Sequence, residues 1–318
     1  MKAAVLHTPG GPGNINIEER PIPEATEGTV LINVKAFGLN RSELMTRKGL
    51  SPNVKFPRVL GIECVGEVVT DPSGEYQKGQ KVAALMGGMG RDFDGGYAEY
   101  TVLPKSILFP FESTLGWEQL GAFPEMFQTV YGSLHLALRI QPGETLLIRG
   151  GTSSIGMLAT QMAKNMGLKV IATTRYAHNE KTLIDNGADE VLIDDGALAV
   201  QVKHPVDKLL ELIGTGTLKD SLRCVKPGGS VCMSGMLAEQ WVVPDFEPIG
   251  FIPSMVNLTV YNSDPKNVSV KIFQDFINSV ESGEISLNVK GVFHLDEIVQ
   301  AHELMESNKA GGKIVVLT

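Results

Sequence analysis

The chain has 318 residues, of which 43% are hydrophobic and 20% charged, and its formal net charge is −8. An acidic chain of this kind argues against a nucleic-acid-binding protein, which normally presents a basic surface. No apolar run approaches the roughly 20 residues that a membrane-spanning helix needs. Three cysteines cannot form a disulfide framework. We therefore expect a two-domain cytoplasmic enzyme with neither a nucleic-acid nor a membrane partner.

Residues 1–124 are predicted to be β-rich. Short apolar runs such as TVLINVKAFGL and ECVGEVV alternate with segments rich in proline and glycine, such as PIPEATEG and GGMGRDFDGG. This pattern is typical of strands joined by tight turns.

From about residue 142 the pattern changes to strands that alternate with helices. An apolar strand at 145–148 is followed by apolar residues at helical spacing. Five further strands are predicted in LKVIATT, EVLID, DKLLELI, SVCMSG (after a KPGG turn) and NLTVYNS. Such an alternation predicts a doubly wound parallel sheet.

The C-terminal part is predicted to contain two helices, at about 267–281 and 295–307, and a final strand, KIVVLT. This order of elements differs from the preceding alternation of strands and helices, so we expect the C-terminal segment to belong to the first domain. The predicted domains are then 1–124 together with 264–318, and an inserted domain at 125–263.

The turn after the strand at 145–148 reads Gly150-Gly151-Thr152-Ser153-Ser154-Ile155-Gly156. Gly150 permits a tight turn, Gly156 permits close packing of a helix, and the N–H groups at a helix start can hold a pyrophosphate. Ser153 replaces the central glycine of the usual dinucleotide motif. The alternative is an ordinary glycine turn in which Ser153 or Ser154 caps the helix.

The next strand ends in Thr173-Thr174-Arg175-Tyr176, and the first carboxylate after it is Glu180. NAD-preferring sites usually place a carboxylate here, whereas an arginine beside hydroxyl groups suits the 2′-phosphate of NADP. We therefore predict NADP as the cofactor, bound by Thr174 and Arg175. The competing interpretation is that Arg175 is a solvated surface residue.

Several stretches in chain order resemble the medium-chain dehydrogenase/reductase superfamily, in its zinc-independent quinone oxidoreductase-like branch. They are MKAAVLHTPGGP, VKAFGLNRSELMTRKG, FPRVLGIECVGEV, DGGYAEYTVLP, FQTVYGSL, GGTSSIG, KPGGSVCMSG and GGKIVVL. The resemblance implies a GroES-like catalytic domain with an inserted Rossmann domain. It also implies NADPH-dependent reduction of a small-molecule quinone or conjugated carbonyl, by a homodimer.

The same resemblance suggests which residues meet the cofactor and the acceptor. It places Asn40 near the nicotinamide and Thr129 near the nicotinamide ribose or amide. Arg41 either polarises the acceptor oxygen or bonds a surface carboxylate. Further candidates for cofactor contact are Ser234, Gly235, Met236, Phe251, Ile252 and Lys313. Phe251 and Ile252 are equally compatible with ordinary core positions.

Zinc is not expected. Zinc-dependent relatives use a cysteine where this chain has Asn40, and a histidine where it has Ile62. Neither residue is a usual zinc ligand, and Cys64 is expected to be a small buried hydrophobe. Without a Lewis acid, the reaction that remains is hydride transfer to an acceptor already activated by conjugation.

Two alternatives remain open. One is a 2-enoyl thioester reductase of the same superfamily, although the tyrosine donor of those relatives has no counterpart between Asn40 and Tyr76. The other is a non-catalytic NADPH-binding protein.

Overall fold

The computed structural model describes all 318 residues, and the chain divides into two compact units. Unit 1 comprises Met1–Gln128 and Asp264–Thr318, and unit 2 comprises Thr129–Ser263. The sequence placed the first boundary at residue 124, where helix α3 (Pro124–Tyr131) begins. The structure places it inside that helix.

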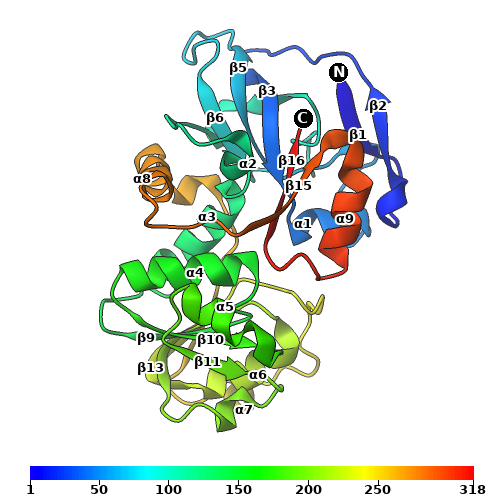
Figure 1. The fold of residues 1–318 in the computed structure, drawn as a ribbon. Coiled ribbons are helices and arrows are strands. Elements are labelled where there is room, and N and C mark those ends of the chain that lie inside the picture. Colours follow the sequence, from blue (N-terminus) through cyan, green and yellow to red (C-terminus); the bar gives the residue numbers. More distant parts are fainter. The chain divides into compact units, whose positions relative to one another are not determined.

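Unit 1 is β-rich, as predicted, and its strands form two sheets (Figure 1). The smaller sheet has the order β2-β1-β4, and the larger has the order β15-β16-β3-β5-β6-β8, with β7 also paired to β3. The strands are β1 (Lys2–Leu6), β2 (Ile15–Glu19), β3 (Thr29–Gly38), β4 (Arg58–Val59), β5 (Glu63–Thr70), β6 (Lys81–Leu85), β7 (Tyr100–Pro104), β8 (Leu108–Pro110), β15 (Val289–His294) and β16 (Lys313–Leu317). Strand β16 pairs antiparallel with β3, so the tail completes a sheet begun near the N-terminus.

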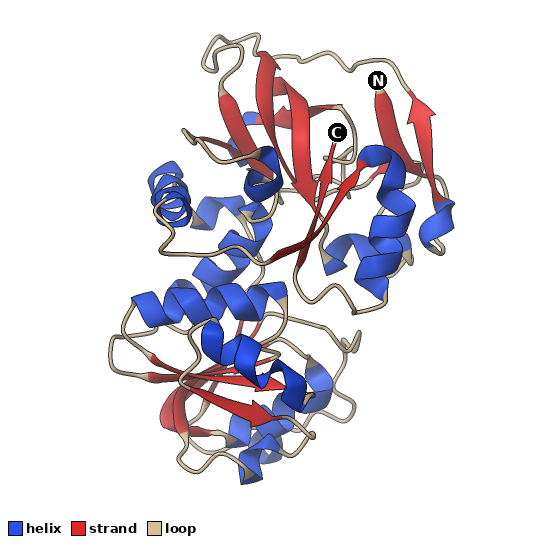
Figure 2. Cartoon of the chain, viewed as in Figure 1, coloured by secondary structure: helices blue, strands red, loops and turns tan.

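Five helices accompany the strands of unit 1 (Figure 2). They are α1 (Arg41–Arg47), α2 (Trp117–Leu120), α3, α8 (Val270–Glu281) and α9 (Ile298–Glu306). The buried face of α8 meets the start of α3 through aromatic rings, and the rings of Phe127 and Phe276 stack with their centroids 4.1 Å apart. This contact ties the tail to the N-terminal segment.

Unit 2 contains the predicted doubly wound sheet. All of its strand pairs are parallel, in the order β11-β10-β9-β12-β13-β14, which is the Rossmann order. The strands are β9 (Thr145–Arg149), β10 (Lys169–Thr174), β11 (Glu190–Ile193), β12 (Val206–Glu211), β13 (Val225–Met233) and β14 (Asn257–Val260). The fold class predicted from the sequence is therefore confirmed.

One detail of this prediction was wrong. The KPGG segment is not a turn before the fifth strand but lies inside β13, which begins at Val225. The pairing with β12 shifts register between Val206 and Lys208, so the strand accommodates the two glycines as an irregularity.

The helices of unit 2 are α4 (Ser154–Asn165), α5 (Glu180–Asp185), α6 (Thr215–Arg223) and α7 (Pro248–Phe251). A π-helical turn, Gly132–Ala137, continues α3. No pattern in the sequence predicted α6, α7 or the π-helical turn. No helix of the structure combines the length and the apolar character needed to cross a membrane.

Candidate active site

The glycine turn of unit 2 joins β9 to α4 and is closed by short contacts. Gly150 has φ +96°, a conformation that glycine adopts at low cost. Ser153 caps α4, because its hydroxyl accepts from the Gly156 N–H at 3.0 Å and donates to the Gly150 carbonyl at 2.8 Å. A Cβ on Gly156 would lie 2.5 Å from the Gly150 oxygen. The helix start therefore packs against the turn so closely that only glycine fits.

This turn suits a pyrophosphate. The first turn of a helix has N–H groups without partners inside the helix, and its dipole favours an anion. In α4 these are the N–H groups of Ser154, Ile155 and Gly156. The hydroxyl of Ser153 accepts a hydrogen bond from the N–H of Gly156. The structure confirms that Ser153 caps the helix, and the binding of a pyrophosphate by the turn stays a prediction.

Thr174 and Arg175 lie at the end of β10. Thr174 is buried, and its hydroxyl accepts from the Tyr176 N–H at 3.2 Å and from the Asn179 amide at 3.3 Å. Arg175 is exposed, with its guanidinium carbon 5.4 Å from the centroid of the Tyr176 ring. No carboxylate forms an ion pair with Arg175. Its positive charge contributes to lowering the pKa of Asp194.

A carboxylate does lie near this strand end, but another arginine compensates it. Asp194 follows β11 and accepts two hydrogen bonds from the buried Arg149, from Nε at 2.7 Å and from Nη2 at 2.8 Å. Burial raises the pKa of Asp194, but the bonds to Arg149 outweigh it and the net pKa is lowered. Sequence reasoning missed Arg149. The available signal was a charged residue closing an apolar run directly before the glycine pair.

The remaining predicted residues of unit 2 lie in packed surroundings. The Thr129 hydroxyl is 2.8 Å from the Ser263 hydroxyl, and the Ser234 hydroxyl is 2.7 Å from that of Ser133. Gly235 packs against the backbone, where a Cβ would lie 2.4 Å from the Leu212 oxygen. Met236, Phe251 and Ile252 are partly buried, and the last two pack against the core of unit 2.

In unit 1 the structure joins Asn40 and Lys313 through Glu63. The Lys313 ammonium donates to Glu63 Oε1 at 2.7 Å and to the Asn40 amide oxygen at 2.6 Å. Asn40 Nδ2 also donates to Glu63 Oε1, at 2.8 Å. Lys313 is only 3% exposed and Glu63 is fully buried. We call these three residues the buried triad.

A second buried carboxylate, Glu43, lies beside the buried triad and was not predicted. It accepts from the N–H of Asn40 at 3.0 Å and from the N–H of Ile62 at 3.1 Å. Burial raises the pKa of Glu43 to about 7. Glu43 therefore fixes the backbone of two residues that the resemblance places at metal-ligand positions.

The other residues considered around this position are Arg41 and Cys64. Arg41 is partly buried and is the first residue of α1. Cys64 is buried, and burial raises the pKa of its thiol, as suits a small core side chain. Nowhere in the structure do three His, Cys, Asp or Glu side chains gather in a way that could hold a metal ion.

Two family models match the chain. Residues 26–113 match the alcohol dehydrogenase GroES-like domain, and residues 186–316 match the zinc-binding dehydrogenase family. Quinone oxidoreductase from Mus musculus is 26% identical, covering 100% of this chain and 98% of that protein. Acryloyl-coenzyme A reductase from Metallosphaera sedula is 23% identical, with 100% of both chains covered.

Solved structures are similar over the whole chain. A mycobacterial protein complexed with NADPH has a TM-score of 0.87 at 25% identity, with 100% of both chains covered. An NAD-dependent alcohol dehydrogenase has a TM-score of 0.89 at 25% identity, also with 100% of both chains covered. The chain therefore belongs to the medium-chain dehydrogenase/reductase superfamily, a family of oxidoreductases. The similarity to quinone oxidoreductases is consistent with the quinone oxidoreductase-like branch of that superfamily.

Proposed function

We propose that this protein is an NADPH-dependent reductase that transfers hydride to a quinone or another conjugated carbonyl without a zinc ion. The observation that carries the proposal is the buried triad. Asn40 stands where zinc-dependent relatives have a cysteine, and its side chain bonds an ammonium and a carboxylate of the same chain. Ile62 stands where they have a histidine. The Lys313 ammonium therefore neutralises the charge of Glu63 at this position.

The cofactor assignment is supported by unit 2. The turn from Gly150 to Gly156 would hold the pyrophosphate, and Thr174 and Arg175 would hold the 2′-phosphate. Arg175 forms no ion pair with the nearby Asp194, which is bonded to Arg149. When bound, NADPH supplies the hydride. Two structural relatives carry names that refer to NADPH and to NAD respectively, so the choice rests on Arg175.

The remaining proposed roles are those of hydride transfer without a zinc ion. A conjugated acceptor can take hydride at carbon and a proton from solvent without a strong protein acid. The protein then supplies position and a few donors. We assign the catalytic contacts to Asn40, Arg41 and Thr129, and wall contacts of the cofactor to Ser234, Gly235, Met236, Phe251 and Ile252. We also propose a catalytic domain of residues 1–124 with 264–318, a cofactor domain of residues 125–263, and a homodimer.

Lys313 is the predicted cofactor residue for which the structure suggests another role. Its ammonium is bonded to Glu63 and Asn40 and is almost fully buried. We propose that it acts as a positioning residue, which orients the Asn40 amide.

The test is NADPH oxidation with a panel of quinones and enones, before and after chelator treatment, together with elemental analysis. We expect turnover that survives chelation and a metal content far below one zinc per chain. Zinc near one per chain, lost together with activity, contradicts the proposal. NADPH binding with no turnover of any acceptor supports the non-catalytic alternative.

A second candidate is an enoyl thioester reductase, which the similarity to an acryloyl-coenzyme A reductase favours. The absence of a tyrosine between Asn40 and Tyr76 counts against it. Acryloyl-coenzyme A in the same panel decides: a kcat/KM well above that of every quinone would replace the first proposal with the second.

A further inference from the structure

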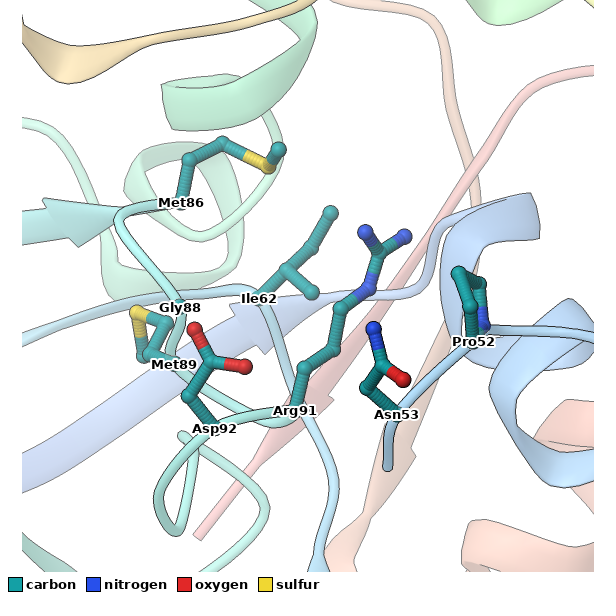
Figure 3. Close-up of a pocket in the computed structure, with 8 residues that line it drawn as sticks. All are labelled: Pro52, Asn53, Ile62, Met86, Gly88, Met89, Arg91 and Asp92. Atoms are coloured by element: carbon teal, nitrogen blue, oxygen red, sulfur yellow. The ribbon is translucent and has the colours of Figure 1, made fainter.

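Unit 1 contains a cavity of about 250 Å³ that begins beside Ile62 (Figure 3). Its walls are partly apolar, through Ile62, Met86 and Met89. The other lining residues are Pro52, Asn53, Gly88, Arg91 and Asp92. The N–H of Ile62 is bonded to Glu43, and the next residue is Glu63 of the buried triad. The cavity therefore adjoins the position proposed for the chemistry.

Arg91 is the cation of this cavity, and its charge is not neutralised. It is partly buried, and one guanidinium nitrogen donates to the Ser42 hydroxyl. Its Nε is buried and has no hydrogen-bond partner. No carboxylate forms an ion pair with it, and Figure 3 shows the guanidinium group of Arg91 lying away from the carboxylate of Asp92. A partly desolvated guanidinium with an unused donor is a binding group for an anion.

The loop that carries Arg91 is held in place by close backbone packing. Met86, Gly88 and Gly90 have φ of 56°, 96° and 73°. A Cβ on Gly90 would lie 2.7 Å from the oxygen of Gly61, the residue before Ile62. The loop therefore folds directly onto the segment that forms the opposite wall, and Arg91 is presented by a fixed backbone.

We propose that this cavity binds the hydride acceptor and that Arg91 binds a carboxylate on it. The preferred substrates are then conjugated carbonyl compounds that carry a carboxylate, with their apolar part against Ile62, Met86 and Met89. This rests on the reductase function proposed above. Arg91 determines specificity and supplies binding energy to the anionic end of the substrate.

The probes are a matched pair of enones, 4-oxo-4-phenylbut-2-enoate and its neutral amide, together with their saturated products. The saturated acid and amide report binding by calorimetry without any turnover. Arg91→Gln should weaken binding of the saturated acid by on the order of tenfold to a hundredfold, because hydrogen bonds to charged groups contribute about 1.5–3 kcal/mol. Binding of the amide should change by less than about twofold.

Two variants accompany Arg91→Gln. Asn53→Asp places a negative charge at the exposed rim, and Asp tolerates the left-handed backbone of Asn53. It should also weaken the acid selectively, without removing Arg91. Arg20→Gln, outside the cavity, serves as the matched control and should change neither affinity.

The outcomes separate this proposal from the reductase function. If wild type discriminates acid from amide and Arg91→Gln abolishes that discrimination, the anion site stands even where no enone oxidises NADPH. Equal losses for acid and amide, no loss for either, or binding of neither by wild type overturns it. A fall in kcat for both enones with unchanged affinities also overturns it, because Arg91 would then act on the carbonyl oxygen.

Discussion

Replacing Lys313 by Met should destabilise unit 1 strongly. The ammonium is 3% exposed, and its partner Glu63 is fully buried 2.7 Å away. Methionine keeps much of the side-chain volume but leaves the carboxylate without its cation. Breaking a buried pair in this way costs about 3–5 kcal/mol, chiefly through the uncompensated charge that remains. We expect a loss of that size in the free energy of unfolding of unit 1.

The two tryptophans make the assay specific for one unit. Trp117 lies in unit 1, and Trp241 lies in unit 2 with 52% of its surface exposed. In a Trp241→Phe background, the fluorescence of Trp117 reports the unfolding of unit 1 in denaturant. The linear dependence on denaturant then gives the change in free energy.

Two controls identify the cause. Lys271→Met removes an ammonium that is 82% exposed and pairs with Asp275, so it should cost less than about 1 kcal/mol. Adding Glu63→Gln to Lys313→Met removes the stranded charge and should recover part of the loss. A cost below about 1 kcal/mol for Lys313→Met, or a double variant no more stable than the single one, would refute the reasoning.

The remaining predictions concern the cofactor turn, the cofactor choice and pH. Gly156→Val should weaken NADPH binding by about tenfold or more, because a Cβ at this position would lie 2.5 Å from the Gly150 oxygen. Calorimetry measures the change in affinity. Gly13→Ala is the control, since a Cβ on Gly13 would meet no atom within 4 Å. Arg175→Ala should raise the KM for NADPH by on the order of tenfold to a hundredfold while leaving NADH nearly unchanged, and equal effects on both would contradict the assignment. Since the folded pKa of Glu43 is about 7 and its ordinary value is 4.5, its contribution to stability is present at low pH and is lost as pH rises through about 7. Glu43→Gln should therefore reduce the fall in the free energy of unfolding between about pH 4.5 and pH 7. Denaturant titrations at several pH values measure this fall, and a fall as steep as that of the wild type would contradict the pKa assignment.

The parallel sheet of unit 2 could be predicted because its signals are local. Each strand is a short apolar run, and the glycine turn with its serine cap spans only seven residues. The buried triad could not be predicted in this way, since Lys313 meets Glu63 across 250 positions and Asn40 across 273. Lysine and glutamate usually indicate surface positions, so nothing in their own segments signals burial.

Arg149 illustrates an intermediate case. Its place at the end of an apolar strand was visible, but its partners Asp194 and Asp220 come from two other segments. Only the order of the parallel strands brings these segments to one edge of the sheet. Cavity-lining residues such as Arg91 lie in a loop whose shape depends on glycines with positive φ, and sequence alone does not fix that shape.

The position of β16 has a consequence for how the protein is made. In the larger sheet of unit 1 it lies between β15 and β3, so residues 36–38 of β3 lack their partner until residues 313–317 have been synthesised. Unit 2 is one continuous segment and can fold on the ribosome while unit 1 is still incomplete. β7 pairs with residues 29–33 of β3, so during translation only the end of β3 at residues 36–38 stays open to wrong strand pairing until β16 emerges. The same strand delivers Lys313, so the charge of Glu63 is neutralised in the step that closes the sheet.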